Sequence, residues 1–176
     1  MTSLSRWAGR CVLALVAAIF IVNVRFVALH LDEIRAVTTP TGSTAPDFTV
    51  PLLDGNSFKL ADTRGTPVVL AFWASWCEPC RQELPQLDAL AKVLGPKARF
   101  VAINVEPAEM KPEAERFAKE AKLAMPVAYG GGDVAEKYKV ESIPHVVVLD
   151  REGKISRVFD GAQSSRDIQA AVEATK

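Results

Sequence analysis

Two cysteines, Cys77 and Cys80, are the residues most able to do chemistry, and only two residues separate them. In the first turn of a helix, that spacing brings two sulfurs close enough for a disulfide bond. The free backbone N–H groups and the positive end of the helix dipole at such a turn favour a thiolate on the first cysteine. The pair therefore indicates thiol–disulfide exchange, with Cys77 as the exposed attacking thiol and Cys80 as the shielded resolving thiol.

The residues on either side of the pair predict a strand that turns into a helix. An apolar, β-branched run at 67–72 reads as a buried strand. Leucines at helical spacing follow the cysteines and predict a helix that ends near Leu94, before Gly95 and Pro96. Pro79 suits the first turn of this helix, because early helical positions have no intrahelical partner for their N–H groups.

A zinc site and a structural disulfide are the simpler interpretations of the pair. The chain has no second Cys-x-x-Cys pair, and its two histidines, His30 and His145, are the only nitrogen ligands on offer. A complete tetrahedral zinc site is therefore disfavoured. A disulfide that closes so short a loop removes little entropy from the unfolded chain, so a purely structural role is disfavoured as well.

Composition limits the class of protein further. A chain of 176 residues suits one domain with a short appendage, and 21 basic against 21 acidic residues leave no electrostatic footprint for nucleic acid. Three cysteines are too few for a disulfide scaffold, which again favours a redox role for one pair.

The amino-terminal segment resembles a membrane anchor. An apolar run begins at Cys11, after Arg6 and Arg10, and extended through Leu31 it would form a helix of about 32 Å, enough to cross a bilayer. We therefore expect residues 11–31 to be a single transmembrane anchor. A signal sequence that is cleaved, which would release a secreted protein, is the alternative.

The charges and composition around this segment predict the rest of the domain organisation. The positive-inside rule places residues 1–10 in the cytoplasm and the remainder on the periplasmic or outer side of the membrane. Residues 32–45, small and polar around 38–44, are predicted to be an extended linker. Residues 46–176 then form the folded domain.

Within that domain the sequence predicts alternating strands and helices. Short strands at 47–50 and 58–60, around the turn signal Asp54-Gly55-Asn56, predict an N-terminal β-hairpin. Asp133 is expected to cap a short helix, and Ser164 with Asp167 to cap the last one. After the cysteine helix we expect a strand, a helix, a short strand, a short helix, a hairpin and a final helix, at 99–105, 112–122, 125–129, 134–138, 145–149 with 155–159, and from 165 onward.

The stretch Trp76-Cys77-Glu78-Pro79-Cys80 at a strand–helix junction resembles a thioredoxin-fold active site, and residues 81–85 resemble those of the membrane-anchored TlpA/ResA-like thioredoxins. The likeness covers residues 45–176. It implies the thioredoxin fold, an α/β fold in which helices flank both faces of a central mixed β-sheet. It also implies a protein of the bacterial cytoplasmic membrane, with protein disulfides as substrates and a membrane protein as electron donor. We expect no metal or cofactor beyond the Cys77–Cys80 disulfide.

The resemblance also predicts roles for residues around the dithiol. It implies that Pro144 is in the cis form, against the cysteine pair. Trp76 is expected to pack beside the dithiol and to shape the docking surface. The Glu78 carboxylate, between the cysteines, should oppose thiolate formation and contribute to partner recognition.

The proton acceptor for the second cysteine is left open. Ala71 stands where thioredoxin usually has a buried aspartate, so Glu106, after the strand at 99–105, is the substitute candidate. In ResA-like relatives a glutamate occurs one residue further along, where this chain has Pro107. The alternative interpretation of Glu106 is a solvated loop carboxylate.

His145, directly after Pro144, also has two interpretations. It is either a partly buried strand residue that bonds locally, or an imidazole near Cys77 and Cys80 that tunes a pKa or helps to bind copper.

The leading functional hypothesis is an extracytoplasmic thiol–disulfide oxidoreductase that acts as a reductase in cytochrome c maturation or copper-centre assembly. One alternative is a copper metallochaperone that uses the cysteine pair and His145. The other is a peroxiredoxin-like peroxidase, but its Pro-x-x-x-Thr-x-x-Cys pattern is missing, because Leu70, Ala74 and Cys77 occupy those places.

Overall fold

The computed structural model describes residues 41–175. The predicted cytoplasmic N-terminus, the anchor at 11–31 and most of the predicted linker lie outside these residues. Of the helices within residues 41–175, none is both long enough and apolar enough to cross a membrane.

A five-stranded mixed sheet forms the centre of the domain. Its strands are β3 (Val68–Trp73), β4 (Arg99–Asn104), β5 (Val127–Ala128), β6 (His145–Leu149) and β7 (Ile155–Asp160). They lie in the order β5-β4-β3-β6-β7, with β3 parallel to β4 and antiparallel to β6. The central strand β3 is buried along its whole length, as its apolar sequence predicts.

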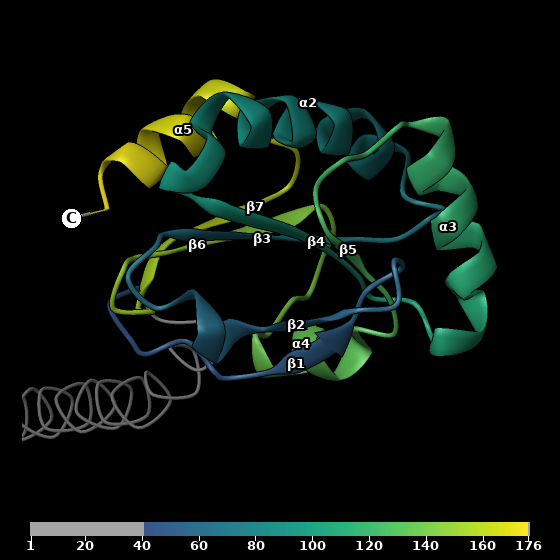
Figure 1. The fold of residues 1–176 in the computed structure, drawn as a ribbon, viewed down its shortest axis with the longest axis horizontal. Helices are drawn as coiled ribbons and strands as arrows, with labels where there is room; N and C mark the ends of the chain where they lie inside the picture. The colour runs from purple at the N-terminus through teal and green to yellow at the C-terminus, as the bar shows by residue number, and fades with distance from the viewer. Residues whose placement is uncertain (1–40, 176) are drawn as a thin grey trace, which may run out of the picture. The chain divides into compact units, whose positions relative to one another are not determined.

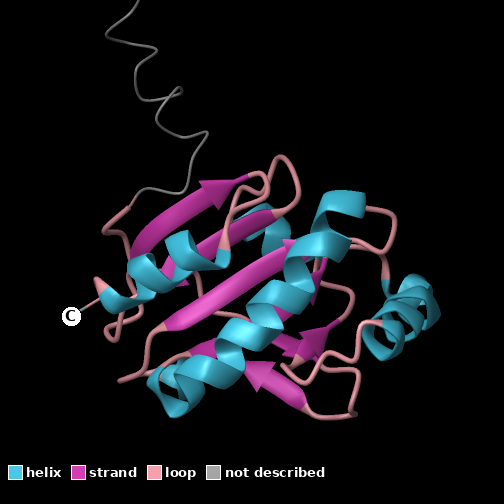
Figure 2. Ribbon diagram, turned by 90° about the horizontal axis from the view of Figure 1, so that it is seen from above, coloured by secondary structure: helices cyan, strands magenta, loops and turns pink. Residues whose placement is uncertain are grey.

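Helices cover both faces of this sheet (Figure 1). The α-helices are α2 (Glu78–Leu94), α3 (Lys111–Glu120), α4 (Gly132–Lys137) and α5 (Ser165–Glu173), and the 3-10 turns are η1 (Leu60–Thr63), η2 (Gly95–Lys97) and η3 (Ala108–Met110). Apolar residues of α2, α3 and α5 form one core cluster with one face of the sheet, and α4 contributes to a second cluster on the other face. Figure 2, viewed from the side of α2 and α5, shows these two helices lying over the strands of the sheet.

A small antiparallel pair, β1 (Thr49–Pro51) and β2 (Ser57–Lys59), lies on the same face as α4 (Figure 1). In the turn between the strands, the Asp54 carboxylate accepts a hydrogen bond of 2.9 Å from the Asn56 N–H. Leu52, just after β1, forms an antiparallel bridge with Ala128 of β5. The pair is thereby fixed to the edge of the main sheet.

The other edge of the sheet holds the last residues of the predicted linker. Gly42 N–H donates to Ile155 O at 2.6 Å, and Ile155 N–H donates to Ser43 O at 2.9 Å. Ala45 is buried. Residues 42–45, which the sequence assigns to the linker, therefore pair through their backbone groups with β7 and the turn before it and belong to the folded domain.

Helix ends follow the predicted signals with one exception. α2 ends at Leu94 as predicted, and the Ser164 hydroxyl accepts from the Asp167 N–H to cap α5. Asp133, however, does not cap α4: the N-cap is Gly131, and no side chain caps this helix. A Cβ at Gly131 would clash with Ile103 Cγ2 and approach Asn104 O of β4, so glycine suits this N-cap position, and Asp133 lies in the first turn.

Candidate active site

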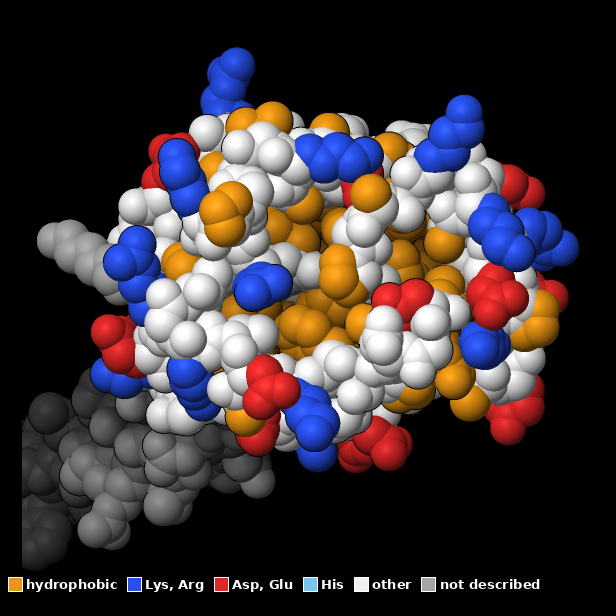
Figure 3. Space-filling model, in the orientation of Figure 1, with side chains coloured by type: hydrophobic (Ala, Val, Ile, Leu, Met, Phe, Trp, Pro, Cys, Tyr) orange, Lys and Arg blue, Asp and Glu red, His pale blue; other side chains and the backbone are white. Residues whose placement is uncertain are grey.

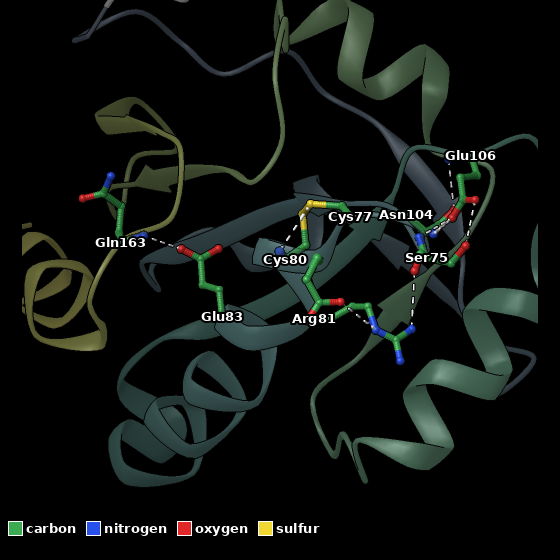
Figure 4. Close-up of a disulfide and its surroundings, with 9 residues drawn as sticks. Ser75, Cys77, Cys80, Arg81, Glu83, Asn104, Glu106 and Gln163 are labelled. Carbon is green, nitrogen blue, oxygen red and sulfur yellow. Dashed lines mark hydrogen bonds and ion pairs between the residues drawn. A yellow bond between two sulfur atoms is a disulfide. The ribbon is translucent and has the colours of Figure 1, made fainter.

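The Cys77–Cys80 disulfide closes the first turn of α2 (Figure 4). β3 ends at Trp73, and a short loop then leads into Cys77, which is the N-cap of the helix. Its Sγ accepts a hydrogen bond of 3.3 Å from the Cys80 N–H. The strand–helix junction thus brings the two cysteines together, with Pro79 in the first helical turn where its missing N–H has no consequence.

Cys77 is 4% exposed and Cys80 is fully buried. The order of exposure agrees with the predicted roles, but Cys77 is far less accessible than predicted. Because its side chain turns back towards the N–H group and the sulfur of Cys80, most of its surface is covered. Only a small part of Cys77 is therefore open to another molecule.

Trp76 provides a large apolar surface next to Cys77, since 72% of it is exposed. It packs less closely than predicted and instead lines a groove of about 320 Å³ together with Val105 and Ile143. The remaining lining residues are Ala135, Val140, Glu141 and Ser142. The Ile143–Pro144 peptide bond is cis, as predicted. An apolar groove rimmed by polar residues beside a redox pair is a suitable contact surface for another polypeptide.

Glu106 is buried, so the alternative of a solvated loop carboxylate is wrong. Its Oε2 accepts hydrogen bonds from the Ser75 N–H at 2.5 Å and from Asn104 Nδ2 at 2.8 Å. Its Oε1 accepts from the Ser75 hydroxyl at 2.9 Å. Figure 4 shows this group beside the loop that leads to Cys77. The carboxylate is occupied with that loop rather than open towards the sulfurs.

Glu83 is the buried acid near the dithiol that the sequence analysis missed. It is 3% exposed, lies three residues after Cys80 in α2, and accepts a hydrogen bond of 2.8 Å from the Gln163 N–H (Figure 4). Burial raises the pKa of Glu83, and the Gln163 N–H partly opposes this. A signal was available, because residues three apart are neighbours on a helix and the adjacent Leu84 and Leu87 mark the buried face.

Glu78, between the two cysteines, points into solvent. Its side chain is 74% exposed and lies 3.9 Å from Arg81 Nε, a separation at which an exposed ion pair contributes little. The Glu78 carboxylate is thus open to solvent.

His145 lies on the opposite face of the sheet from the cysteines. Its ring packs edge-on against Phe72, with centroids 5.9 Å apart, in the core cluster that includes α4. The next residue, Val146, belongs to the cluster that contains Cys77 and Cys80, and successive strand residues face opposite sides. The interpretation that places His145 near the sulfurs is therefore wrong, and a copper site of Cys77, Cys80 and His145 is not formed.

What His145 does instead is bond locally, as its simpler interpretation predicts. Its Nδ1 lies 2.6 Å from Asp160 Oδ1 on β7, and 3% of the residue is exposed, so it is more deeply buried than expected. Within residues 41–175, no group of three or more His, Cys, Asp or Glu side chains is arranged to hold a metal ion.

A second hollow lies away from this site. In Figure 3, apolar side chains gather between α2 and the β1–β2 pair, where a cavity of about 450 Å³ is lined by residues that include Phe58, Phe100 and Met125. Phe100 is at the start of β4, whereas Glu106 follows its end. The hollow is therefore at the opposite end of the sheet from the dithiol.

Comparison with known proteins agrees with this geometry. The profile of the AhpC/TSA family matches residues 41–158. The chain belongs to that family. It is 34% identical over 137 residues to the thiol-disulfide oxidoreductase ResA of Geobacillus thermodenitrificans, which covers 77% of this chain and 78% of that protein. It is also 34% identical over 140 residues to the thioredoxin-like protein YneN of Bacillus subtilis, which covers 79% of this chain and 82% of that one.

Solved structures include relatives with the same fold. A thiol:disulfide interchange protein of the thioredoxin family from Chlorobium tepidum matches with a TM-score of 0.69 and 26% identity, and the match covers 78% of this chain and 97% of that one. The predicted thioredoxin fold and the resemblance to ResA-like proteins are confirmed. The chain is a thiol–disulfide oxidoreductase, and its family implies disulfides of proteins as substrates.

Proposed function

We propose that this oxidoreductase works outside the cytoplasm and that Cys77 and Cys80 carry its electrons, without a resident metal or cofactor. The observation that supports the proposal best is the placement of the pair. Both sulfurs lie at the N-terminus of α2, and Cys77 is the more exposed of the two, beside the Trp76 groove.

The exchange has two steps, starting from the reduced pair. The Cys77 thiolate, stabilised by the free N–H groups of α2, attacks one sulfur of the partner's disulfide. That S–S bond breaks, a mixed disulfide forms, and the second partner sulfur leaves as a thiolate. The Cys80 thiolate then attacks Cys77 Sγ, which releases the reduced partner and forms the Cys77–Cys80 disulfide. Two electrons pass from the pair to the partner.

Glu83 is the group that best fits the role of proton acceptor for Cys80. The second step needs a thiolate on a sulfur that is fully buried, so a nearby base must take its proton. Glu83 is one helical turn away, and its raised pKa makes its carboxylate a stronger base than an exposed one. Glu106 is less suited, because Ser75 and Asn104 occupy its oxygens.

The partner would dock on Trp76 and the adjoining groove. Its apolar lining residues can receive an apolar side chain next to the partner's cystine, while exposed Glu141 lies in the same lining. This placement supports disulfides of proteins, rather than small-molecule disulfides, as the substrates.

The cellular role is proposed from the sequence and from the resemblance. The apolar segment 11–31 after Arg6 and Arg10 supports one anchor in the bacterial cytoplasmic membrane, with the catalytic domain on the periplasmic or outer side; secretion after cleavage is the alternative. In such an oxidising compartment a reductase needs a membrane protein as electron donor. The likeness to ResA supports a role in cytochrome c maturation, and copper-centre assembly is the related possibility.

A trapping experiment tests this function. The Cys80→Ser variant, expressed in full length in its host, should retain a partner covalently bound to Cys77 until a reductant releases it. Cys77→Ser should trap nothing and should abolish reduction of insulin. If Cys80→Ser traps no partner under conditions where a known oxidoreductase traps its own, or if Cys77→Ser keeps full insulin reduction, the proposal fails.

A further inference from the structure

The loop before Cys77 is held by a buried polar cluster of Ser75, Asn104 and Glu106. Asn104 is 1% exposed and Glu106 is 6% exposed. The Glu106 carboxylate accepts from both the N–H and the hydroxyl of Ser75, and Asn104 holds it from the other side by donating from Nδ2 and accepting from the Glu106 N–H at 3.0 Å. No Lys or Arg within residues 41–175 pairs with Glu106, so these hydrogen bonds must compensate for its burial.

Arg81 holds Ser75 from the side opposite to Glu106. Its Nη1 donates to Ser75 O at 3.4 Å (Figure 4). The guanidinium lies 4.6 Å above the ring centroid of Phe117, and its Nη2 lies 3.6 Å from Glu120 Oε2, so α3 fixes its position. The N–H, hydroxyl and carbonyl of Ser75 are therefore all bonded to groups outside its loop.

Ser75 is two residues before Cys77, inside a turn in which the Cys77 N–H donates to Ala74 O at 3.1 Å, and the residue between them, Trp76, is largely exposed. The contacts of Ser75 therefore help to fix the turn from which the Trp76 and Cys77 side chains project. We propose that Glu106 is a positioning residue for Cys77, acting through Ser75: it sets the angle at which the attacking sulfur meets a disulfide. This inference rests on the proposed function of the pair.

The chemistry of the cluster permits a matched substitution. In Glu106→Gln, the amide oxygen can take the place of Oε2 and still accept from the Ser75 N–H and from Asn104. The amide NH₂ then takes the place of Oε1 and donates to the Ser75 hydroxyl, which can accept as well as donate. The charge is removed and every contact is kept. Glu106→Ala removes the charge and the contacts together.

The experiment measures reduction of a small disulfide, which needs no docking, across pH with the full-length protein. The rate should rise with pH to a plateau at which Cys77 is fully ionised. For Glu106→Ala this plateau rate should fall about tenfold or more, as expected when an attacking group is misplaced. For Glu106→Gln the plateau should stay within about twofold of the unaltered protein and the pH midpoint should not move. Glu109→Gln, at an exposed acid nearby, is the control, and thermal unfolding shows whether Glu106→Ala is folded at the assay temperature.

Two results would overturn the inference. If Glu106→Gln loses as much rate as Glu106→Ala, or moves the pH midpoint, Glu106 acts through its charge. If neither variant changes the rate, the cluster does not position Cys77. Should Glu106→Ala be unfolded, Asn104→Ala and Ser75→Gly, which remove part of the same contacts, must lower the plateau by a smaller factor, and unchanged rates in both contradict the inference. The proposed function fails separately, through full activity of Cys77→Ser.

Discussion

The backbone N–H of Gln163 donates a hydrogen bond of 2.8 Å to the carboxylate of Glu83, one helical turn after Cys80. The bond joins α2 to the loop that follows β7, and Gly161 in that loop donates its N–H to Pro144 O at 2.9 Å. Glu83 therefore links the helix of the redox pair to the loop that contacts the cis-proline. Two predictions follow from the burial of this acid.

The first concerns stability against pH. Burial raises the pKa of Glu83 above its ordinary value of 4.5, so the folded state binds a proton more tightly than the unfolded state. The contribution of Glu83 is fully present below pH 4.5 and is lost as the pH rises through the raised pKa, with a slope of at most about 1.4 kcal/mol per pH unit. Glu83→Gln keeps an acceptor for Gln163 and cannot ionise. Its free energy of unfolding should exceed that of the unaltered protein by more at pH 7 than at pH 4, measured in denaturant on the oxidised form.

The second prediction concerns the release of the partner. If Glu83 takes the proton of Cys80, Glu83→Gln should slow the second step of the exchange, in which the mixed disulfide breaks, by about 10²-fold or more. The first attack by Cys77 should change much less. Rapid-mixing measurements that follow the mixed disulfide separate the two steps. Adding Gln82→Glu to the Glu83→Gln variant places an exposed carboxyl at the neighbouring position, and it should not restore the rate of the second step. An unchanged second step would exclude Glu83 as the acceptor.

Trp76 should affect docking much more than stability. Because it is 72% exposed, Trp76→Ala should change the free energy of unfolding by less than about 0.5 kcal/mol. The KM for a protein disulfide should rise several-fold, since buried Trp side chains contribute strongly to interfaces. Val93→Ala is the matched control, because Val93 is 76% exposed but lies about 20 Å further along α2. Equal KM values for the two variants would contradict docking at the groove.

The order of elements could be predicted because it depends on local signals. The apolar run of β3, the leucine spacing of α2 and the Ser164 cap each involve residues close together in the chain, and all three have the predicted form. The placement of the cysteine pair at the end of a central strand follows from the same signals, which is why the redox site could be found from the sequence.

The surroundings of the pair could not be predicted in the same way, because they depend on distant contacts. Glu106 meets Ser75 across 31 positions, and Glu83 meets Gln163 across 80. The face of the sheet on which His145 lies could not be predicted either. All five residues of β6 are buried, so the strand has no alternation of polar and apolar residues to show which side faces the cysteines. Residues 42–45 pair with β7 and the preceding turn through backbone groups, so their side chains show no hydrophobic pattern from which the pairing could be predicted.

Asp88 is expected to be important for stability although it lies away from the dithiol. It is 4% exposed, its Oδ1 accepts from the N–H groups of Ala124 and Met125, both at 2.7 Å, and its Oδ2 lies 2.6 Å from Lys92 Nζ. Asp88→Ala leaves those N–H groups without their acceptor and should lower the free energy of unfolding by about 2 kcal/mol or more. Lys92→Ala, which removes an ion pair whose lysine is 60% exposed, should cost less than about 1 kcal/mol.

The pH dependence separates the charge of Asp88 from its role as an acceptor. Burial favours the neutral acid, but Lys92 and the two N–H groups outweigh it and lower the pKa of Asp88 below its ordinary 3.8. A lowered pKa contributes stability that is present above pH 3.8 and is lost as the pH falls through the pKa of the folded state. The free energy of unfolding of the unaltered protein should therefore exceed that of Asp88→Ala by less in acid than at pH 7. Asp88→Asn keeps an oxygen for both N–H groups, so its free energy of unfolding at pH 7 should lie between those of the unaltered protein and Asp88→Ala. The difference between Asp88→Asn and Asp88→Ala should not narrow in acid. Equal losses in Asp88→Ala and Lys92→Ala at pH 7 would show that the N–H contacts do not stabilise the fold.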